Sequence, residues 1–266
     1  MATVNDVFDV LNKFAPVEMK MDFDNVGLLV GRGEAHVSKI IAALDVSDDV
    51  ISESIELDAQ LIVSHHPMFF SLKSVTDEDL TGKKIVRMLS NGKSAICMHT
   101  NLDAARGGVN DALAKAAGIA DDREACLLTD DLMLSNGEIY SYGRVGFLKE
   151  PCTMQEYLER LKKTLKTSGL RYYDSGREVY KVALVGGSGG SEFHHAIRHD
   201  CDTFVTADIK YNLFLEAKEL GINLIDGDHF CTENLAMDVI VRLLRESFSD
   251  VEVVVSKSLV QPVKFY

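Results

Sequence analysis

The chain has 266 residues, of which 46% are hydrophobic and 26% charged, and this is the composition of a globular protein with a sizeable core. Its 41 acidic residues outnumber 28 lysines and arginines, so a formal net charge of -13 argues against nucleic-acid binding. No stretch approaches the ~20 apolar residues of a membrane span, and the N-terminus lacks the apolar run of a signal peptide. The five cysteines are odd in number and form no C-x-x-C pair, so we expect reduced thiols in a cytoplasmic protein.

The first half of the chain alternates predicted strands with predicted helices. In chain order these are a strand at 37–45, a helix at 48–57, a strand at 60–64, a helix at 79–91, a strand at 94–98 and a helix at 109–117. This alternation predicts a parallel sheet with helices on its faces.

A polar, acidic stretch at about 119–140 marks the expected domain boundary, and a second α/β series follows it. Its predicted strands are 142–148, 179–185, 202–205, 222–226 and 251–255, and its predicted helices are about 153–167, 190–198, 208–220 and 232–248. We therefore expect an α/β protein of two lobes, 1–125 and 126–266, each a mostly parallel or mixed sheet flanked by helices.

Imidazole and carboxylate side chains follow three of the predicted strands, where open α/β sheets bind their ligands. The strand at 60–64 leads into His65 and His66, the strand at 94–98 leads to His99 and then Asp103, and the strand at 222–226 leads through Asp226 and Asp228 to His229 and Glu233. Four of the protein's eight histidines lie at these three points.

This mixture of ligands predicts a site for two transition-metal ions. Imidazole with carboxylate suits Zn, Mn, Fe or Ni better than Ca. Five or six such groups are too many for one tetrahedral zinc and fit two ions roughly 3.5–4 Å apart. A helix beginning near His229 would put Glu233 on the same face, as a carboxylate that bridges both ions. His65 and His66 can both be ligands only if the backbone turns there, and Pro67 favours such a turn.

Three other features lie outside this predicted ligand set. We expect His194, His195 and His199 to be solvated helix residues. The glycine-rich run at 185–191 lacks the lysine of a P-loop, and it either cradles a phosphate or carboxylate or makes a tight turn. Cys97 and Cys231 flank the predicted ligands, and buried packing is favoured over metal binding.

Several sequence runs, taken together and in order, resemble one family. They are DNVGLLVG at 24–31, SHHP at 64–67, MHTNLDAARGGVNDALA at 98–114, VGGSGG at 185–190, TADIKYN at 206–212 and DGDHFCTE at 226–233. The chain resembles the NIF-three-like family, whose members are widely labelled GTP cyclohydrolase I type 2 homologues.

The resemblance implies a two-lobed α/β fold, a dinuclear metal site between the lobes and a ring-shaped homohexamer. Carried over by position, His66 and Asp103 would hold one ion, His65 and His229 the other, and Glu233 both. His99 would lie beside the ions as a supporting or proton-handling group.

The chain also departs from the family pattern. At 266 residues it is too short for the inserted central domain of longer relatives. Asp228 and Asn212 stand where glycine and histidine are expected.

The leading functional hypothesis is a metal-dependent hydrolase in which a metal-bound hydroxide attacks carbon or phosphorus. The family label suggests a nucleotide such as GTP as its small-molecule substrate. The alternative is a non-catalytic metal-binding or regulatory protein that acts through protein partners.

Overall fold

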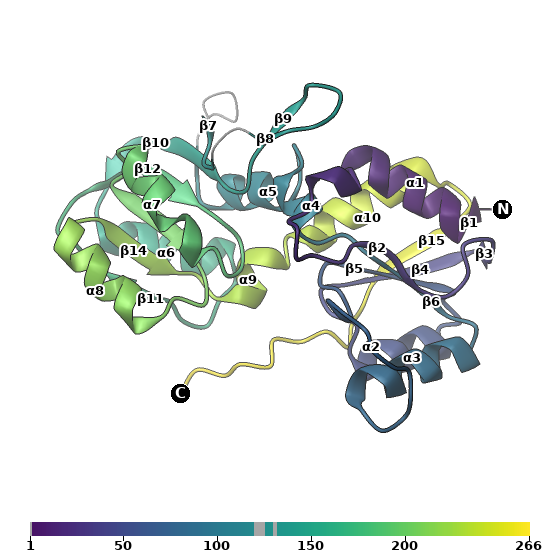
Figure 1. Ribbon diagram of the computed structural model, residues 1–266. Helices are drawn as coiled ribbons and strands as arrows, with labels where there is room; N and C mark the ends of the chain where they lie inside the picture. Colours follow the sequence, from purple (N-terminus) through teal and green to yellow (C-terminus); the bar gives the residue numbers. More distant parts are fainter. Residues whose placement is uncertain (1, 120–125, 130–131) are drawn as a thin grey trace. The chain divides into compact units, whose positions relative to one another are not determined.

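The computed structural model describes residues 2–119, 126–129 and 132–266 (Figure 1). It divides into two compact units, each described here by itself. Unit 1 comprises Met1–Ala105 and Ala236–Gln261, and unit 2 comprises Arg106–Leu235 and Pro262–Tyr266. The described chain therefore has no third unit corresponding to the inserted domain of longer relatives, as the sequence predicts.

Unit 1 is built on a five-stranded sheet. Its strands, in spatial order, are β15 (Glu252–Val255), β4 (Lys39–Ala43), β5 (Leu61–Ser64), β6 (Ser94–Cys97) and β2 (Gly27–Val30). The first four are mutually parallel and β2 is an antiparallel edge. Every residue of β5 and β6 is buried, which explains why these strands read as continuous apolar runs.

Helices cover both faces of this sheet (Figure 1). The helices α2 (Asp48–Glu56) and α3 (Leu80–Ser90) pack on one face, and α1 (Val4–Phe14) and α10 (Ala236–Ser247) pack on the other. Local signals fix where they begin: Ser47 caps α2, Asp79 caps α3, and Thr3 forms a capping box with Asp6 at the start of α1. The remaining elements are β1 (Ala2–Thr3), η1 (Val17–Met19), β3 (His36–Val37) and α4 (Thr100–Ala104).

Unit 2 is built on a six-stranded mixed sheet. Its spatial order is β11 (Arg171–Tyr173), β14 (Asn223–Asp226), β13 (Thr203–Thr206), β12 (Val179–Leu184), β10 (Arg144–Cys152) and β7 (Cys126–Leu127). The three central strands are parallel and the others antiparallel. A separate hairpin joins β8 (Leu132–Met133) to β9 (Ile139–Tyr140).

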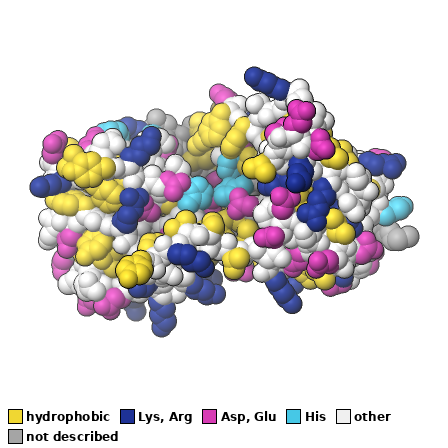
Figure 2. Space-filling model, turned by 90° about the horizontal axis from the view of Figure 1, so that it is seen from below, with side chains coloured by type: hydrophobic (Ala, Val, Ile, Leu, Met, Phe, Trp, Pro, Cys, Tyr) yellow, Lys and Arg dark blue, Asp and Glu magenta, His cyan; other side chains and the backbone are white. Residues whose placement is uncertain are grey.

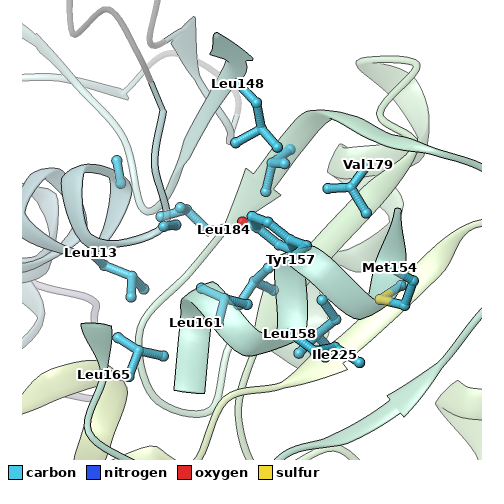
Figure 3. Packing of buried hydrophobic residues seen from close by; sticks show 14 of the residues in the cluster. Leu113, Leu148, Met154, Tyr157, Leu158, Leu161, Leu165, Val179, Leu184 and Ile225 are labelled. Carbon is cyan, nitrogen blue, oxygen red and sulfur yellow. The ribbon is translucent and has the colours of Figure 1, made fainter. Parts of the chain in front are cut away.

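The two faces of the second sheet carry separate apolar cores. The helices α5 (Val109–Ala116) and α6 (Met154–Thr164) cover one face, where Tyr157 and Leu161 of α6 lie among Leu113, Leu184 and Ile225 (Figure 3). The helices α7 (Phe193–Arg198), preceded by η2 (Gly190–Glu192), and α8 (Tyr211–Leu220) contribute to the other core. Each fully buried leucine stabilises the fold by about 1.5–3 kcal/mol.

The C-terminal part of the chain departs from the predicted lobes. The helix expected at 232–248 is two helices, α9 (His229–Glu233) and α10, and the chain passes from unit 2 to unit 1 between them. Because β15 pairs with β4, the last strand belongs to the first sheet and not to a lobe running from 126 to 266. The first unit likewise ends at Ala105 rather than at residue 125.

The surface carries charged side chains of both signs, as the composition requires. On the face shown in Figure 2, acidic and basic side chains are interspersed, with no extended basic patch. Among the helices of the described ranges, none is long and apolar enough to cross a membrane.

Candidate metal centre

Three histidines gather at one edge of the unit 1 sheet. The parallel strands β5 and β6 are neighbours, and the register pairs their last residues, Ser64 and Cys97. His65 and His66 follow β5, and His99 follows β6, so all three leave the sheet at its carboxyl edge. Ring centroids lie 5.1 Å apart for His65 and His66, and 5.2 Å and 5.5 Å from these to His99. One ring nitrogen from each histidine lies within 4.8 Å of the others.

Each of these three rings is anchored through Nδ1 to an oxygen atom. The pairs are His65 Nδ1 with the Met98 carbonyl at 2.9 Å, His66 Nδ1 with Asp45 Oδ1 at 2.8 Å, and His99 Nδ1 with Asp24 Oδ1 at 2.8 Å. An Nδ1–H that donates to such an acceptor fixes the tautomer and leaves the Nε2 lone pair for a metal ion.

Asp24 is the most deeply held of the anchoring groups. Its side chain is fully buried and accepts hydrogen bonds from the Thr100 backbone N–H at 3.0 Å and from the Thr100 hydroxyl. Burial by itself raises the pKa of Asp24, but the hydrogen bond and charge of His99, together with Thr100, outweigh it and lower the pKa to about 2. Asp24 is therefore a permanent carboxylate partner for His99.

Asp103 joins the same edge through α4. His99 occupies the N-cap position of this short helix, and Asp103 lies in its first turn. The Asp103 carboxylate is buried, with Oδ1 at 3.6 Å from His65 Nε2. The structure of unit 1 thus brings together His65, His66, His99 and Asp103, as the sequence predicts.

Unit 2 carries the remaining predicted ligands on α9. His229 and Glu233 are one turn apart, with His229 Nε2 at 2.8 Å from Glu233 Oε2. His229 Nδ1 lies 2.7 Å from Asp208 Oδ2, so this ring has the same carboxylate anchor as His66 and His99. Burial lowers the pKa of His229, but Glu233 and Asp208 outweigh it and raise the pKa to about 9. These two carboxylates therefore favour the protonated form of His229.

Two residues beside His229 have left-handed backbones. Asp228 has φ 72° and its side chain accepts a hydrogen bond from the Cys231 N–H at the start of α9. The positive φ explains why glycine is expected there, since with a ψ of 127° this backbone lies outside the αL region in which aspartate is common. Asp208, whose carboxylate contacts His229 Nδ1, also has a positive φ, of 54°.

Comparison with known proteins identifies the family. The family model described as Duf34/NIF3 (NGG1p interacting factor 3) matches residues 2–262. The chain belongs to this family. It is 35% identical to the GTP cyclohydrolase 1 type 2 homolog of Clostridium acetobutylicum, covering 98% of each chain, and 33% identical to the GTP cyclohydrolase 1 type 2 of Helicobacter pylori, covering 94% of each. A Bacillus cereus protein related to NIF3 has the same fold, with a TM-score of 0.90, 23% identity and coverage of 100% of this chain and 99% of the other.

The glycine-rich run of this NIF3-family protein forms a turn whose N–H groups are largely occupied. The Gly186 N–H donates to Asn110 Oδ1 at 2.8 Å, the Gly187 N–H to Thr232 Oγ1 at 3.1 Å, and the Gly189 N–H to Thr206 Oγ1 at 2.9 Å. Of the two interpretations left open by the sequence, a tight turn is favoured over an anion cradle, because these donors already have protein acceptors.

His194, His199 and Cys97 have protein partners of their own. His194 is exposed, with Nε2 at 3.2 Å from Glu216, and His199 Nε2 lies 3.1 Å from the Leu128 carbonyl. Cys97 is buried and its thiol donates to the His65 carbonyl at 3.0 Å. Burial raises the pKa of Cys97 well above its ordinary value, which favours packing over metal binding.

Proposed function

We propose that this NIF3-family protein binds two divalent metal ions per chain and uses them in a metal-dependent hydrolytic reaction. The observation that carries the proposal is the anchoring of the proposed ligands His65, His66 and His229, each through Nδ1 to a protein oxygen. A metal-binding histidine almost always donates its other ring N–H to such an acceptor, which orients the ring and raises its basicity.

The proposed ligands are His65, His66, Asp103, His229 and Glu233. Following the family resemblance, His66 and Asp103 hold one ion, His65 and His229 the other, and Glu233 both. Imidazole and carboxylate donors suit Zn, Fe, Mn or Ni, and they exclude the all-oxygen shell that Ca prefers.

The chain's own residues supply the proton chemistry beside these ions. When bound, a pair of divalent ions supplies a water of lowered pKa and stabilises developing negative charge. His99 is the proposed proton-handling group, because its ring lies 5.2 Å from that of His65 and the Asp24 carboxylate holds its Nδ1. A proton taken up at His99 Nε2 would be stabilised by Asp24.

The substrate is proposed from the names of the relatives. The proposed substrate is a small molecule of the nucleotide class, such as GTP, after the label GTP cyclohydrolase 1 type 2 carried by the Helicobacter pylori protein. A homohexameric ring and a cytoplasmic location stay predictions from the family resemblance and the composition.

Metal content tests the proposal. We expect protein purified without chelator to carry close to two divalent ions per chain by elemental analysis. His66→Ala should lose metal, because it removes a ligand, and the matched control His194→Ala should retain it, because His194 is exposed and is not among the proposed ligands. A metal-free wild-type protein that added Zn, Mn or Fe does not restore would refute the proposal.

Activity is tested on the same preparations. Metal-loaded wild-type protein, screened against nucleotides and other small phosphate and amide compounds, should hydrolyse a substrate that His66→Ala leaves intact. A protein that holds both ions and turns over no compound would favour the non-catalytic alternative.

A further inference from the structure

We propose that Gly187 is a positioning residue of the candidate metal centre, and that its missing side chain provides the space occupied by the Glu233 carboxylate. The inference rests on the proposed function, because its main test measures metal affinity. It also gives the glycine-rich turn a role in holding a ligand in place, which the turn's sequence does not indicate.

The space at Gly187 is already filled. A Cβ atom built on Gly187 would overlap Glu233 Oε1, and it would lie 2.7 Å from Glu233 Cδ and 3.3 Å from His229 Nε2. Its neighbour Gly186 is less constrained, since a Cβ there would lie 3.5 Å from Glu233 Cγ, an ordinary contact distance. The Gly187 backbone therefore lies directly against the carboxylate.

The backbone at Gly187 cannot easily retreat. Its N–H donates to Thr232 Oγ1 at 3.1 Å, and Thr232 lies on α9 one residue before Glu233. Its carbonyl accepts from the Thr206 hydroxyl at 3.0 Å and from the Ala207 N–H at 2.8 Å. These bonds attach the turn both to the helix that carries the ligand and to the end of β13.

The carboxylate has little freedom to move in response. Glu233 is 4% exposed, and its Oε2 lies 2.8 Å from His229 Nε2. A methyl group on Gly187 must therefore push the carboxylate away from His229 and out of its position. Metal affinity falls about 10–100-fold when the surroundings that orient a ligand are lost, and we expect a loss of that size.

The experiment compares Gly187→Ala with two matched glycine variants. Gly190→Ala changes the same turn, where a Cβ would make only a 3.5 Å contact with Leu213. Gly221→Ala has nearly the same left-handed backbone, φ 67° against 62°, and its Cβ would have no described heavy atom within 4 Å. It therefore measures the backbone strain alone. We expect Gly187→Ala to lose metal affinity about 10–100-fold and both controls to keep it, with Tm falling in Gly221→Ala and falling further in Gly187→Ala.

A second variant separates displacement of the carboxylate from a general defect. The aspartate of Glu233→Asp is shorter by one methylene and should leave room for a methyl group at position 187. Gly187→Ala should therefore lower the metal affinity by a smaller factor in the Glu233→Asp background than in the wild type. An equal loss in both backgrounds would overturn the inference, as would full metal affinity in Gly187→Ala.

A readout without metal distinguishes failure of this inference from failure of the proposed function. In crystal structures of the metal-free proteins, we expect the Glu233 carboxylate to contact His229 in the wild type and to have moved away in Gly187→Ala. If the wild type binds no metal, the proposed function fails and this comparison alone decides: displacement supports the role of Gly187, and an unmoved carboxylate refutes it.

Discussion

At the scale of single residues, the oxygen atom that contacts Nδ1 of each histidine determines which ring nitrogen is available to a metal ion. His66 illustrates this best, because its Nδ1 lies 2.8 Å from Asp45 Oδ1 and the Asp45 side chain is 49% exposed. Asp45 therefore contributes little to the buried core, and its effect on the imidazole can be removed without creating a cavity. A carboxylate on Nδ1 raises the basicity of Nε2 as well as fixing its direction.

Asp45→Ala should weaken metal binding about 10–100-fold while leaving the stability of the metal-free protein within about 0.5 kcal/mol. The physical reason is that His66 keeps its place but loses the acceptor that orients its ring. Isothermal titration with Zn and thermal unfolding of the metal-free protein measure the two effects. Asp49→Ala, an exposed acid in the first turn of the neighbouring helix α2, is the matched control for metal binding and should leave the metal affinity unchanged. Unaltered metal affinity in Asp45→Ala would contradict the anchoring role.

These anchors mark the limit of what the sequence predicts at the site. The histidines stand out because they directly follow apolar strands. Their partners Asp45, Asp24 and Asp208 lie 21, 75 and 21 residues away along the chain, and they meet the rings only after folding. Asp24 and Asp208 do fall inside runs that resemble the family, and that was the available signal.

At the scale of elements, one glutamate fixes the chain after the last strand. The Glu53 carboxylate, on α2, accepts hydrogen bonds from the Ser256 hydroxyl at 2.6 Å and from the Lys257 and Ser258 N–H groups at 3.0 Å each. Partial burial raises the pKa of Glu53, but these bonds outweigh it and hold the pKa below the ordinary 4.5. A lowered carboxyl pKa means that the ionised form stabilises the folded state.

The sign of the pH effect follows from this direction. The contribution of Glu53 is fully present above the pKa of an unfolded glutamate and is lost as the pH falls through the lowered pKa of the folded state. We expect the Lys257 and Ser258 amide resonances, followed by NMR from about pH 6 to about pH 2, to shift with a midpoint below 4.5.

The control is a pair of glutamine variants on α2. Glu53→Gln should abolish this pH-dependent shift of the amide resonances. Glu56→Gln, which changes an exposed residue three positions further along the same helix, should preserve it. A midpoint at or above the ordinary value would show that Glu53 does not hold this segment.

The elements themselves were largely predictable, because their signals are local. Strands such as β5 and β6 are buried on both faces and read as short apolar runs, and helices such as α3 begin at capping residues. The break between α9 and α10 was not predictable, since the apolar pattern continues through both helices. The pairing of β15 with β4 was not predictable either, because the sequence of a parallel strand does not indicate which sheet it joins.

At the scale of the whole molecule, the proposed ligands are divided between the two units. Unit 1 contains His65, His66 and Asp103, and unit 2 contains His229 and Glu233. Metal that binds the folded protein and not the unfolded chain stabilises the folded state. Free metal at about a thousand times its Kd adds about 4 kcal/mol to the free energy of unfolding.

Glu233→Ala should remove most of this metal-induced stabilisation, and His99→Ala should preserve it. Glu233 is the proposed bridge, so its loss takes one ligand from each ion and also removes the negative charge that offsets their mutual repulsion. His99 is proposed to move protons, and its loss should impair turnover alone. Tm and bound metal, each measured with and without chelator, separate the two variants.

An exposed glutamate of unit 2 provides the comparison. Glu219 lies on the solvent side of α8, so Glu219→Ala should keep the metal and the full rise in Tm. If Glu233 were not a ligand, its removal would break the contact with His229 but release no metal. Full metal occupancy and an undiminished rise in Tm in Glu233→Ala would therefore refute the bridge, even if the histidines proved to be ligands.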